Sequence, residues 1–207
     1  MSIEIETNKV YLQGVVETVP EYNHTVKDED FYTFNLRVLR LSGQNDVIPI
    51  TISKKLLDFN NIKKDDLIAV KGQFRSFNKI DGDKRKLLLS VFVKEVCEVD
   101  NNANSNVVEL DGYICKPAIY RTTPFSREIC DVLLAVNRNF NKSDYIPCIA
   151  WGNNAQTVSK MPVPTKLKLL GRIQSREYVK YEGDNKNPIT KTAYEVSVSK
   201  ILSNETT

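Results

Sequence analysis

The sequence predicts an all-β chain that contains two copies of one small barrel domain. Three observations lead to this fold class. The sequence repeats itself at a spacing of about 98 residues, each repeat consists of strand-sized runs of β-branched and aromatic residues, and a polar, Asn-rich stretch separates the repeats. The 207 residues suffice for two domains of about 100 residues, each able to bury its own core.

The repeat appears as matching residues when the chain is shifted by 98 or 99 positions. The clearest matches are Gly14 with Gly112, Gly72 with Gly171, and DVIPI at 46–50 with DYIPC at 144–148. We therefore expect a first domain at 1–100, a linker at 101–106 and a second domain at 107–207.

The second copy has the more regular pattern. Its predicted strands are 107–116, 130–137, 144–151, 166–178 and 192–201. A predicted helix at 153–160 separates the third strand from the fourth. Five strands with a helix in this place form the element order of the OB-fold, a Greek-key barrel that binds oligonucleotides. The glycine inside the first strand suits the bend of a small barrel. In the less regular first copy we expect the helix at 54–60 and, in the second, a long loop at 179–191.

The third strand separates the barrel interior from the surface, because its side chains alternate between two faces. One face is apolar in both copies: Ile48, Ile50 and Ile52, and Ile146, Cys148 and Ala150. The other face carries Val47, Pro49, Thr51 and Ser53 in the first copy, and Tyr145, Pro147, Ile149 and Trp151 in the second. The rings of the second copy favour a stacking platform for bases. The alternative is that they pack under a loop or a subunit contact.

Charge is unevenly distributed between the copies. Residues 1–100 contain 15 Lys and Arg against 16 Asp and Glu, and residues 101–207 contain 14 against 10, which sum to the net charge of +3. The basic excess of the second copy is compatible with an anionic partner but is weak evidence alone.

Composition argues against several other classes of protein. Apolar runs are too short for a membrane span, and the first residues are acidic where a signal peptide is basic. Four scattered cysteines without a C-x-x-C pair indicate buried thiols in a reducing cytoplasm. We therefore expect a cytoplasmic protein that does not contact membranes.

We expect no enzyme activity, no metal site and no cofactor. The single histidine, His24, lies in a polar stretch, where a solvated loop residue is expected rather than a catalytic base. The eight glycines form neither a G-x-G-x-x-G turn nor a P-loop. A nuclease would need a carboxylate cluster that binds a metal ion, and the sequence does not reveal one.

Several segments of the second copy resemble bacterial single-stranded DNA-binding proteins. These segments are DGYICKP at 111–117, YRTTPF at 120–125, LLAVNR at 133–138, DYIPCIAWG at 144–152 and GRIQSREY at 171–178. The resemblance implies an OB-fold that binds single strands, non-specifically for sequence, by aromatic stacking and Lys/Arg phosphate contacts in replication, recombination or repair. It also implies a nucleoid-associated protein, and assemblies of four OB domains, which a two-domain chain would reach as a homodimer.

The resemblance also assigns the site residues. The family's stacking aromatics fall on Phe140, Tyr145, Trp151 and Tyr178, whereas the first copy has Ser42, Val47, Ser53 and Lys79 in these places. Residues that flank these positions are further candidates: Lys116, Tyr120, Arg121, Arg127, Arg138, Lys142, Arg172, Arg176, Lys180 and Tyr181. The first copy is thus expected to be poor in aromatic rings, and to serve assembly or to bind weakly through Arg37, Arg40, Arg75, Phe77 and Lys79.

Members of this family typically end in a flexible tail with an acidic, apolar tip, whereas this sequence stops at Thr207. We therefore do not expect tail-mediated recruitment of replication proteins. The alternative function is a primosomal-type tandem-OB scaffold that acts mainly through protein–protein contacts.

Overall fold

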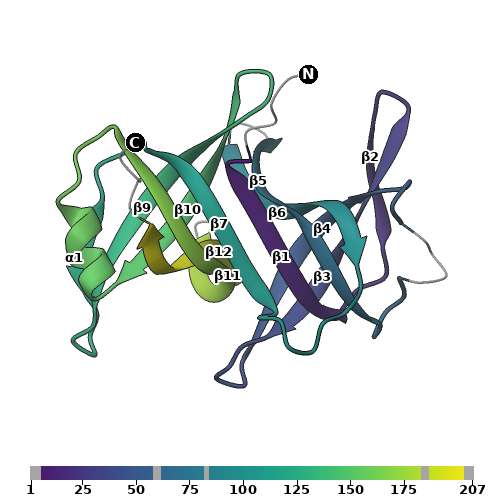
Figure 1. Ribbon diagram of the computed structural model, residues 1–207, viewed down its shortest axis with the longest axis horizontal. Helices are drawn as coiled ribbons and strands as arrows, with labels where there is room; N and C mark the ends of the chain where they lie inside the picture. The colour runs from purple at the N-terminus through teal and green to yellow at the C-terminus, as the bar shows by residue number, and fades with distance from the viewer. Residues whose placement is uncertain (1–5, 58–61, 82–83, 183–186, 203–207) are drawn as a thin grey trace.

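The computed structural model describes residues 6–57, 62–81, 84–182 and 187–202, which form two β-barrels side by side (Figure 1). Barrel 1 contains β1 (Asn8–Val16), β2 (Glu21–Val26), β3 (Glu29–Leu39), β4 (Asn45–Ser53), β5 (Leu67–Asp81) and β6 (Lys84–Cys97). Barrel 2 contains β7 (Asn106–Ile114), β8 (Ile119–Thr122), β9 (Glu128–Arg138), β10 (Lys142–Trp151), α1 (Asn153–Ser159), β11 (Thr165–Glu182) and β12 (Asn187–Leu202). Among the described residues α1 is the only helix, and its seven residues are too few to cross a bilayer.

The two barrels have the same strand order. In barrel 1 the strands pair as β1–β3–β4–β6–β5–β1, and in barrel 2 as β7–β9–β10–β12–β11–β7. The β4–β6 and β10–β12 pairings are parallel, and the other pairings of both barrels are antiparallel. This closed order is the Greek-key barrel that the element order predicts, so the two tandem OB-folds are confirmed.

The predicted core is confirmed. Ile48, Ile50 and Ile52 of β4 are fully buried, and so are Ile146 and Ala150 of β10. A methyl group on Gly112 would overlap the carbonyl oxygen of Ala135, 2.5 Å away, so the bend in the first strand needs a residue without a side chain. Of the four free cysteines, Cys130 and Cys148 are buried, while Cys97 and Cys115 are half-buried.

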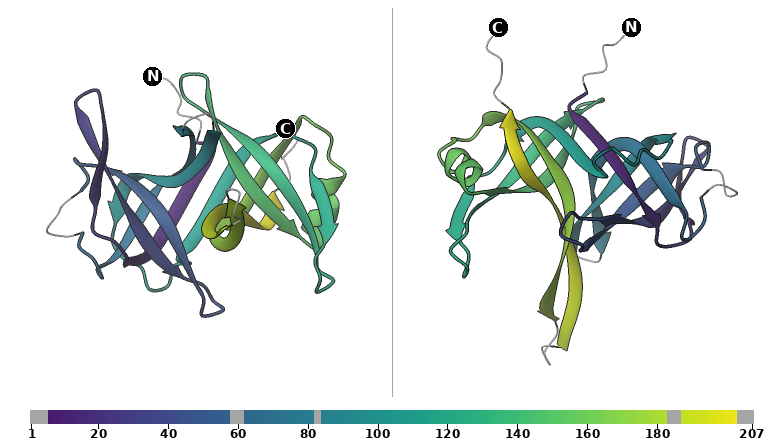
Figure 2. Two further views of the ribbon diagram at one scale, coloured as in Figure 1. Left: turned by 180° about the vertical axis from the view of Figure 1, so that it is seen from behind. Right: turned by 60° about the horizontal axis from the view of Figure 1, so that its bottom comes forward.

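The structure corrects two local predictions and adds two strands. Lys54–Leu56, where the first-copy helix was expected, is a turn, and residues 58–60 of that prediction lie outside the described residues. The predicted loop at 179–191 is largely a β-ribbon, because β11 and β12 stay paired as far as Glu182 and Asn187. This ribbon projects from the body of the molecule (Figure 2). The sequence also did not reveal the exposed edge strands β2 and β8, which bury almost no apolar surface.

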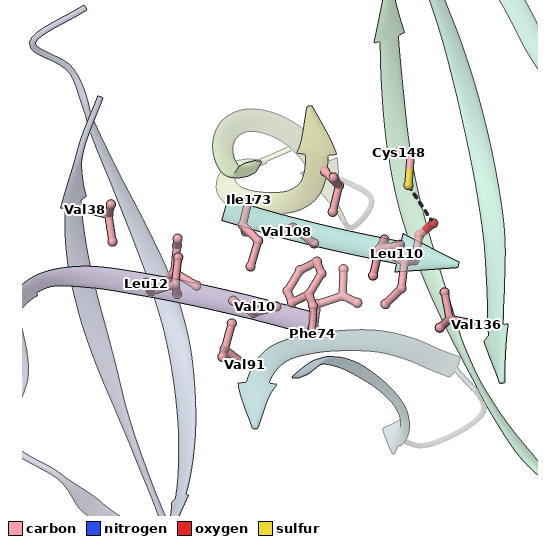
Figure 3. Packing of buried hydrophobic residues seen from close by; sticks show 14 of the residues in the cluster. Val10, Leu12, Val38, Phe74, Val91, Val108, Leu110, Val136, Cys148 and Ile173 are labelled. Carbon is pink, nitrogen blue, oxygen red and sulfur yellow. Dashed lines mark hydrogen bonds between the residues drawn. The ribbon is translucent and has the colours of Figure 1, made fainter. Parts of the chain in front are cut away.

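The barrels join through an antiparallel pairing of β1 with β7 (Figures 1 and 3). Val10 lies opposite Val108, its own equivalent in the repeat, so a local twofold axis passes through this pair. On either side of this axis, two equivalent asparagines make the same pair of hydrogen bonds to the backbone. The buried Asn8 side chain bonds the backbone N–H and C=O of Phe74 at 2.9 and 2.7 Å, and buried Asn106 bonds those of Ile173 at the same distances.

Each barrel also contributes one buried carboxylate that accepts a backbone hydrogen bond from the other barrel. Asp46 of barrel 1 accepts the backbone N–H of Ser175 at 2.6 Å, and Asp144 of barrel 2 accepts the backbone N–H of Ser76 at 2.8 Å. The side chain of Asp46 has no exposed surface, and it also receives Arg40 at 2.5 Å and Arg172 at 3.4 Å. The junction is therefore held by ordered polar contacts as well as by the shared sheet.

We expect Asp46→Ala to lower the free energy of unfolding by about 3 kcal/mol, because it leaves the Ser175 N–H and two guanidinium groups without their buried partner. Urea denaturation measures this loss. The matched control is Asp131→Ala, which removes a surface partner of Arg121 at 2.7 Å and should cost less than about 1 kcal/mol. Equal losses for the two variants would contradict the structural role of Asp46.

Candidate nucleic-acid interface

The outer surface of barrel 2 brings together most of the predicted aromatic residues. Tyr145 lies on β10 and is 43% exposed, and Tyr178 lies on β11 and is 39% exposed. The strand register links them, since Ile149 of β10 pairs with Ser197 of β12, and Ser197 pairs with Arg172 of β11. Because side chains alternate along a strand, Arg172, Arg176, Tyr178 and Lys180 all point to this outer face. Tyr181 points to the other face of the ribbon and is 65% exposed.

Phe140 is the most exposed of the predicted stacking residues, with 92% of its surface open to solvent. It lies in the turn between β9 and β10, where Phe140 and Asn141 have φ angles of +64° and +54°. A bulky residue seldom adopts this left-handed conformation, which is sterically strained. An apolar ring that is both strained and exposed serves no purpose in the barrel core, so a binding role accounts better for its placement.

Trp151 is less open than the sequence suggests. It is half-buried at the end of β10, and its indole N–H donates to the Ser197 hydroxyl at 3.1 Å. Ile149, on the same strand face, is only 5% exposed. The outer strip of β10 is therefore open at Tyr145, covered at Ile149 and partly open at Trp151.

The predicted cations fall into two groups. Arg121, Arg138 and Arg172 are engaged in ion pairs, with Asp131 at 2.7 Å, Asp144 at 3.7 Å and Asp46 at 3.4 Å respectively. The other five are exposed: Lys116, Arg127, Lys142, Arg176 and Lys180.

Burial affects the ionisation of the paired groups at the junction. Desolvation raises the pKa of Asp144, although the Ser76 N–H and the charges of Arg138 and Arg75 oppose this shift. Desolvation likewise lowers the pKa of Arg172, and the nearby charge of Arg40 adds to the effect. Arg172 thus pairs with Asp46 across the junction, whereas Arg138 pairs with Asp144 of its own barrel. The Tyr120 hydroxyl donates to Glu128, which raises the pKa of the tyrosine.

Two neighbouring cavities between barrel 1 and this surface share the lining residues Arg75 and Arg138. The first, which we call the junction cleft, has a volume of about 440 Å³ and extends from the β2–β3 turn to the β9–β10 turn. Its charged and aromatic lining residues are Lys27, Arg75, Arg138, Phe140, Lys142 and Asp144. The second, the hairpin groove, has a volume of about 360 Å³ and is lined by Asn23, His24, Arg75, Phe77, Phe92 and Arg138. Sequence reasoning did not foresee either cavity, because each is built from segments distant in the chain.

Barrel 1 also contains aromatic residues outside the predicted positions. The outer face of β4 lacks aromatic residues, as expected, but neighbouring strands supply them. His24 of β2 stacks on Phe31 of β3 with 5.1 Å between ring centroids, and Phe31 packs against Phe92 of β6 at 5.6 Å. The guanidinium of Arg75 lies 3.8 Å above the Phe92 ring. The expectation of an aromatic-poor first copy compared only the positions of the family's stacking residues, and it did not include these rings of β2, β3 and β6.

The described residues contain no cluster of His, Cys, Asp and Glu side chains suited to a metal ion. What the outer surface of barrel 2 and its cleft offer instead is exposed rings beside cations. This combination suits a ligand with flat apolar groups and negative charges, which is the chemistry of a single nucleic-acid strand.

Comparison with known proteins supports this chemistry. Residues 105–202 match the single-strand binding protein family. Two curated relatives are single-stranded DNA-binding protein 3 of Streptococcus agalactiae, 33% identical over 85 residues, and single-stranded DNA-binding protein 1 of Streptococcus pyogenes, 34% identical over 85 residues. Each match spans 38% of this chain and covers 62% and 65% of the relatives, so the chain spans less than two thirds of their length. Their names denote binding proteins rather than enzymes, in agreement with the sequence prediction.

The solved structures extend the likeness to both barrels. The wild-type single-stranded DNA-binding protein of Thermus aquaticus superposes with a TM-score of 0.72 and 20% identity, covering 95% of this chain and 92% of that chain. The two chains therefore share their fold over almost their whole length.

Proposed function

Because residues 105–202 match the single-strand binding protein family, we propose that the chain binds single-stranded DNA without sequence specificity. The observation that carries the proposal is the set of exposed rings on barrel 2, Phe140, Tyr145 and Tyr178, which the sequence resemblance predicts as stacking residues. Bases stack on such rings, and every base has a flat face, so the binding tolerates any sequence.

Cations around these rings would hold the phosphates of the strand. Lys142 lines the junction cleft beside Phe140, and Arg176 lies on the same face of β11 as Tyr178. No ion pair engages Lys142 or Arg176 within the described residues, so both are available to a phosphate. Lys116, Arg127 and Lys180 would add contacts at the edges of this surface, with Tyr120, Arg121 and Tyr181 beside them.

Barrel 2 is thus the principal binding domain in this proposal, and residues 1–100 form a divergent domain whose main part is assembly. Such a protein would protect single strands during DNA replication, recombination or repair, in the cytoplasm at the nucleoid. It would also form a homodimer, which presents four OB domains to one strand.

The single tryptophan gives the most direct test of the site. A base stacked on Trp151 should quench its fluorescence, and Trp151→Ala should weaken binding about 5- to 150-fold, since stacking contributes about 1–3 kcal/mol per base. Titration with oligothymidylate measures both effects.

Two further variants serve as controls for this test. Trp151→Phe keeps a ring but loses the bond to Ser197 and should retain most of the affinity. Ile146→Ala truncates a fully buried side chain and should cost about 2–5 kcal/mol of stability. If Trp151→Ala unfolds the protein and DNA leaves the wild-type emission unchanged, Trp151 is a packing residue and the site is wrong.

Salt dependence tests the phosphate contacts. The logarithm of the affinity for single strands should fall linearly with the logarithm of salt concentration, with a slope of about −0.7 per phosphate contacted. Lys142→Ala should make this slope shallower by about 0.7. Lys168→Ala is the control, because Lys168 pairs with Glu109 at 2.9 Å on the sheet that joins the barrels. A flat response of the wild type would instead favour a scaffold that acts through proteins.

The assembly is tested by light scattering at micromolar concentration. We expect the mass of a dimer, which is twice the 23.6 kDa of the chain. A monomer in solution would overturn the homodimer without affecting the DNA-binding surface.

A further inference from the structure

The hairpin groove on barrel 1 combines features that no packing role requires. Its two exposed aromatic side chains come from different strands, His24 from β2 and Phe77 from β5, and Phe77 is 48% exposed. The groove volume of about 360 Å³ lies within the range of about 300–1,000 Å³ that is usual for ligand clefts. It is therefore large enough for a planar group.

The rings of the groove are held in place from behind. The His24 ring lies nearly parallel to that of Phe31, with 13° between the planes, and Phe31 is only 9% exposed. Because His24 is stacked on one side and exposed to solvent, its other face is open to a ligand. Phe92 is fixed in the same way between Phe31 and the guanidinium of Arg75. A rigid ring loses little entropy when it binds, which favours stacking.

The groove adjoins the junction cleft. Arg75 and Arg138 line both cavities, and the β2–β3 hairpin borders both, with His24 at the groove and Lys27 at the cleft. A strand that leaves Phe140 and Lys142 through the cleft would therefore reach the groove directly.

The charges along this path suit phosphates. Among the described residues that line the two cavities, Lys27, Arg75, Arg138 and Lys142 are basic and Asp144 is the single acid. Asp144 is buried, with 1% of its surface exposed, and it accepts the Ser76 N–H. It is therefore shielded from a strand in the cleft, and it pairs with Arg138, so the other three cations make the path basic.

We propose that the hairpin groove is a second stacking site, in which His24 and Phe77 bind a base of the strand that leaves barrel 2 through the junction cleft. This inference rests on the proposed function, since barrel 2 must first bind the strand. It assigns to barrel 1 a direct part in binding, through residues that do not correspond to the stacking positions of barrel 2.

The test uses oligothymidylates of increasing length with the full chain. An OB domain occupies about 4–16 nucleotides, so a short oligomer fills barrel 2 alone and a longer one also spans the groove. The double variant His24→Ala/Phe77→Ala should bind the short oligomer like the wild type and the long one at least about 5-fold more weakly. His24→Phe/Phe77→Tyr keeps both rings and should restore the affinity. Val19→Ala, which removes an exposed apolar side chain of barrel 1 outside both cavities, should have no effect.

A second measurement uses the wild-type protein and needs no variant to fold. His24 is the single histidine of the chain, so its ring protons give one isolated set of NMR signals. The long oligomer should shift these signals and the short one should not.

The outcomes separate the two proposals. Absence of Trp151 quenching and of measurable affinity for any oligomer would overturn the proposed function. Normal binding of the short oligomer, with unchanged His24 signals and equal long-oligomer affinity for the double variant and the wild type, would overturn the hairpin groove alone.

Discussion

The pairing of β1 with β7 is the constraint on which the arrangement of the molecule depends. It places Val10 against its own equivalent Val108, so the two copies of the repeat meet about a local twofold axis. The reciprocal bonds of Asp46 with Ser175 and of Asp144 with Ser76 follow from that symmetry. Because these carboxylates are buried, each needs its partners from the other barrel, and neither barrel completes its polar contacts alone.

The same symmetry shows where the two copies have diverged. On β5 and β11 the order of arginine and glutamine is exchanged, since Gln73 and Arg75 correspond to Arg172 and Gln174. Arg172 bonds Asp46 within the junction, whereas Arg75 stacks on Phe92. Because of this exchange, Arg172 is a structural cation of the junction, whereas Arg75, on the other side of the axis, lines both cavities. The backbones of β5 and β11 are therefore equivalent, but their side chains form different surfaces.

Much of this fold could be predicted, because strand alternation and the repeat depend on local sequence. Ile48 and Ile146 can be assigned to the interior because the residues two positions away are also apolar. The resemblance of barrel 2 to a known family predicts which of its residues form an exposed surface. The junction could not be predicted, since Asp46 and Ser175 are distant in the chain and only the fold brings them together. The aromatic residues His24, Phe31 and Phe92 of barrel 1 were missed for the same reason. They come from β2, β3 and β6, and the sequence of β4 gives no sign of them.

The junction also explains why proximity to the aromatic rings does not by itself make a cation a phosphate ligand. Arg138 and Arg172 lie within the surface, but each faces a buried carboxylate of the junction. A phosphate that bound either of them would have to compete with that carboxylate, and withdrawing the arginine would leave a buried charge without its partner. Lys142 and Arg176 carry no such cost, because no ion pair engages them in the described part of the chain. In the proposed function, stability and phosphate binding therefore depend on different cations, and substitutions of Lys142 and Arg176 should change affinity while leaving the fold intact.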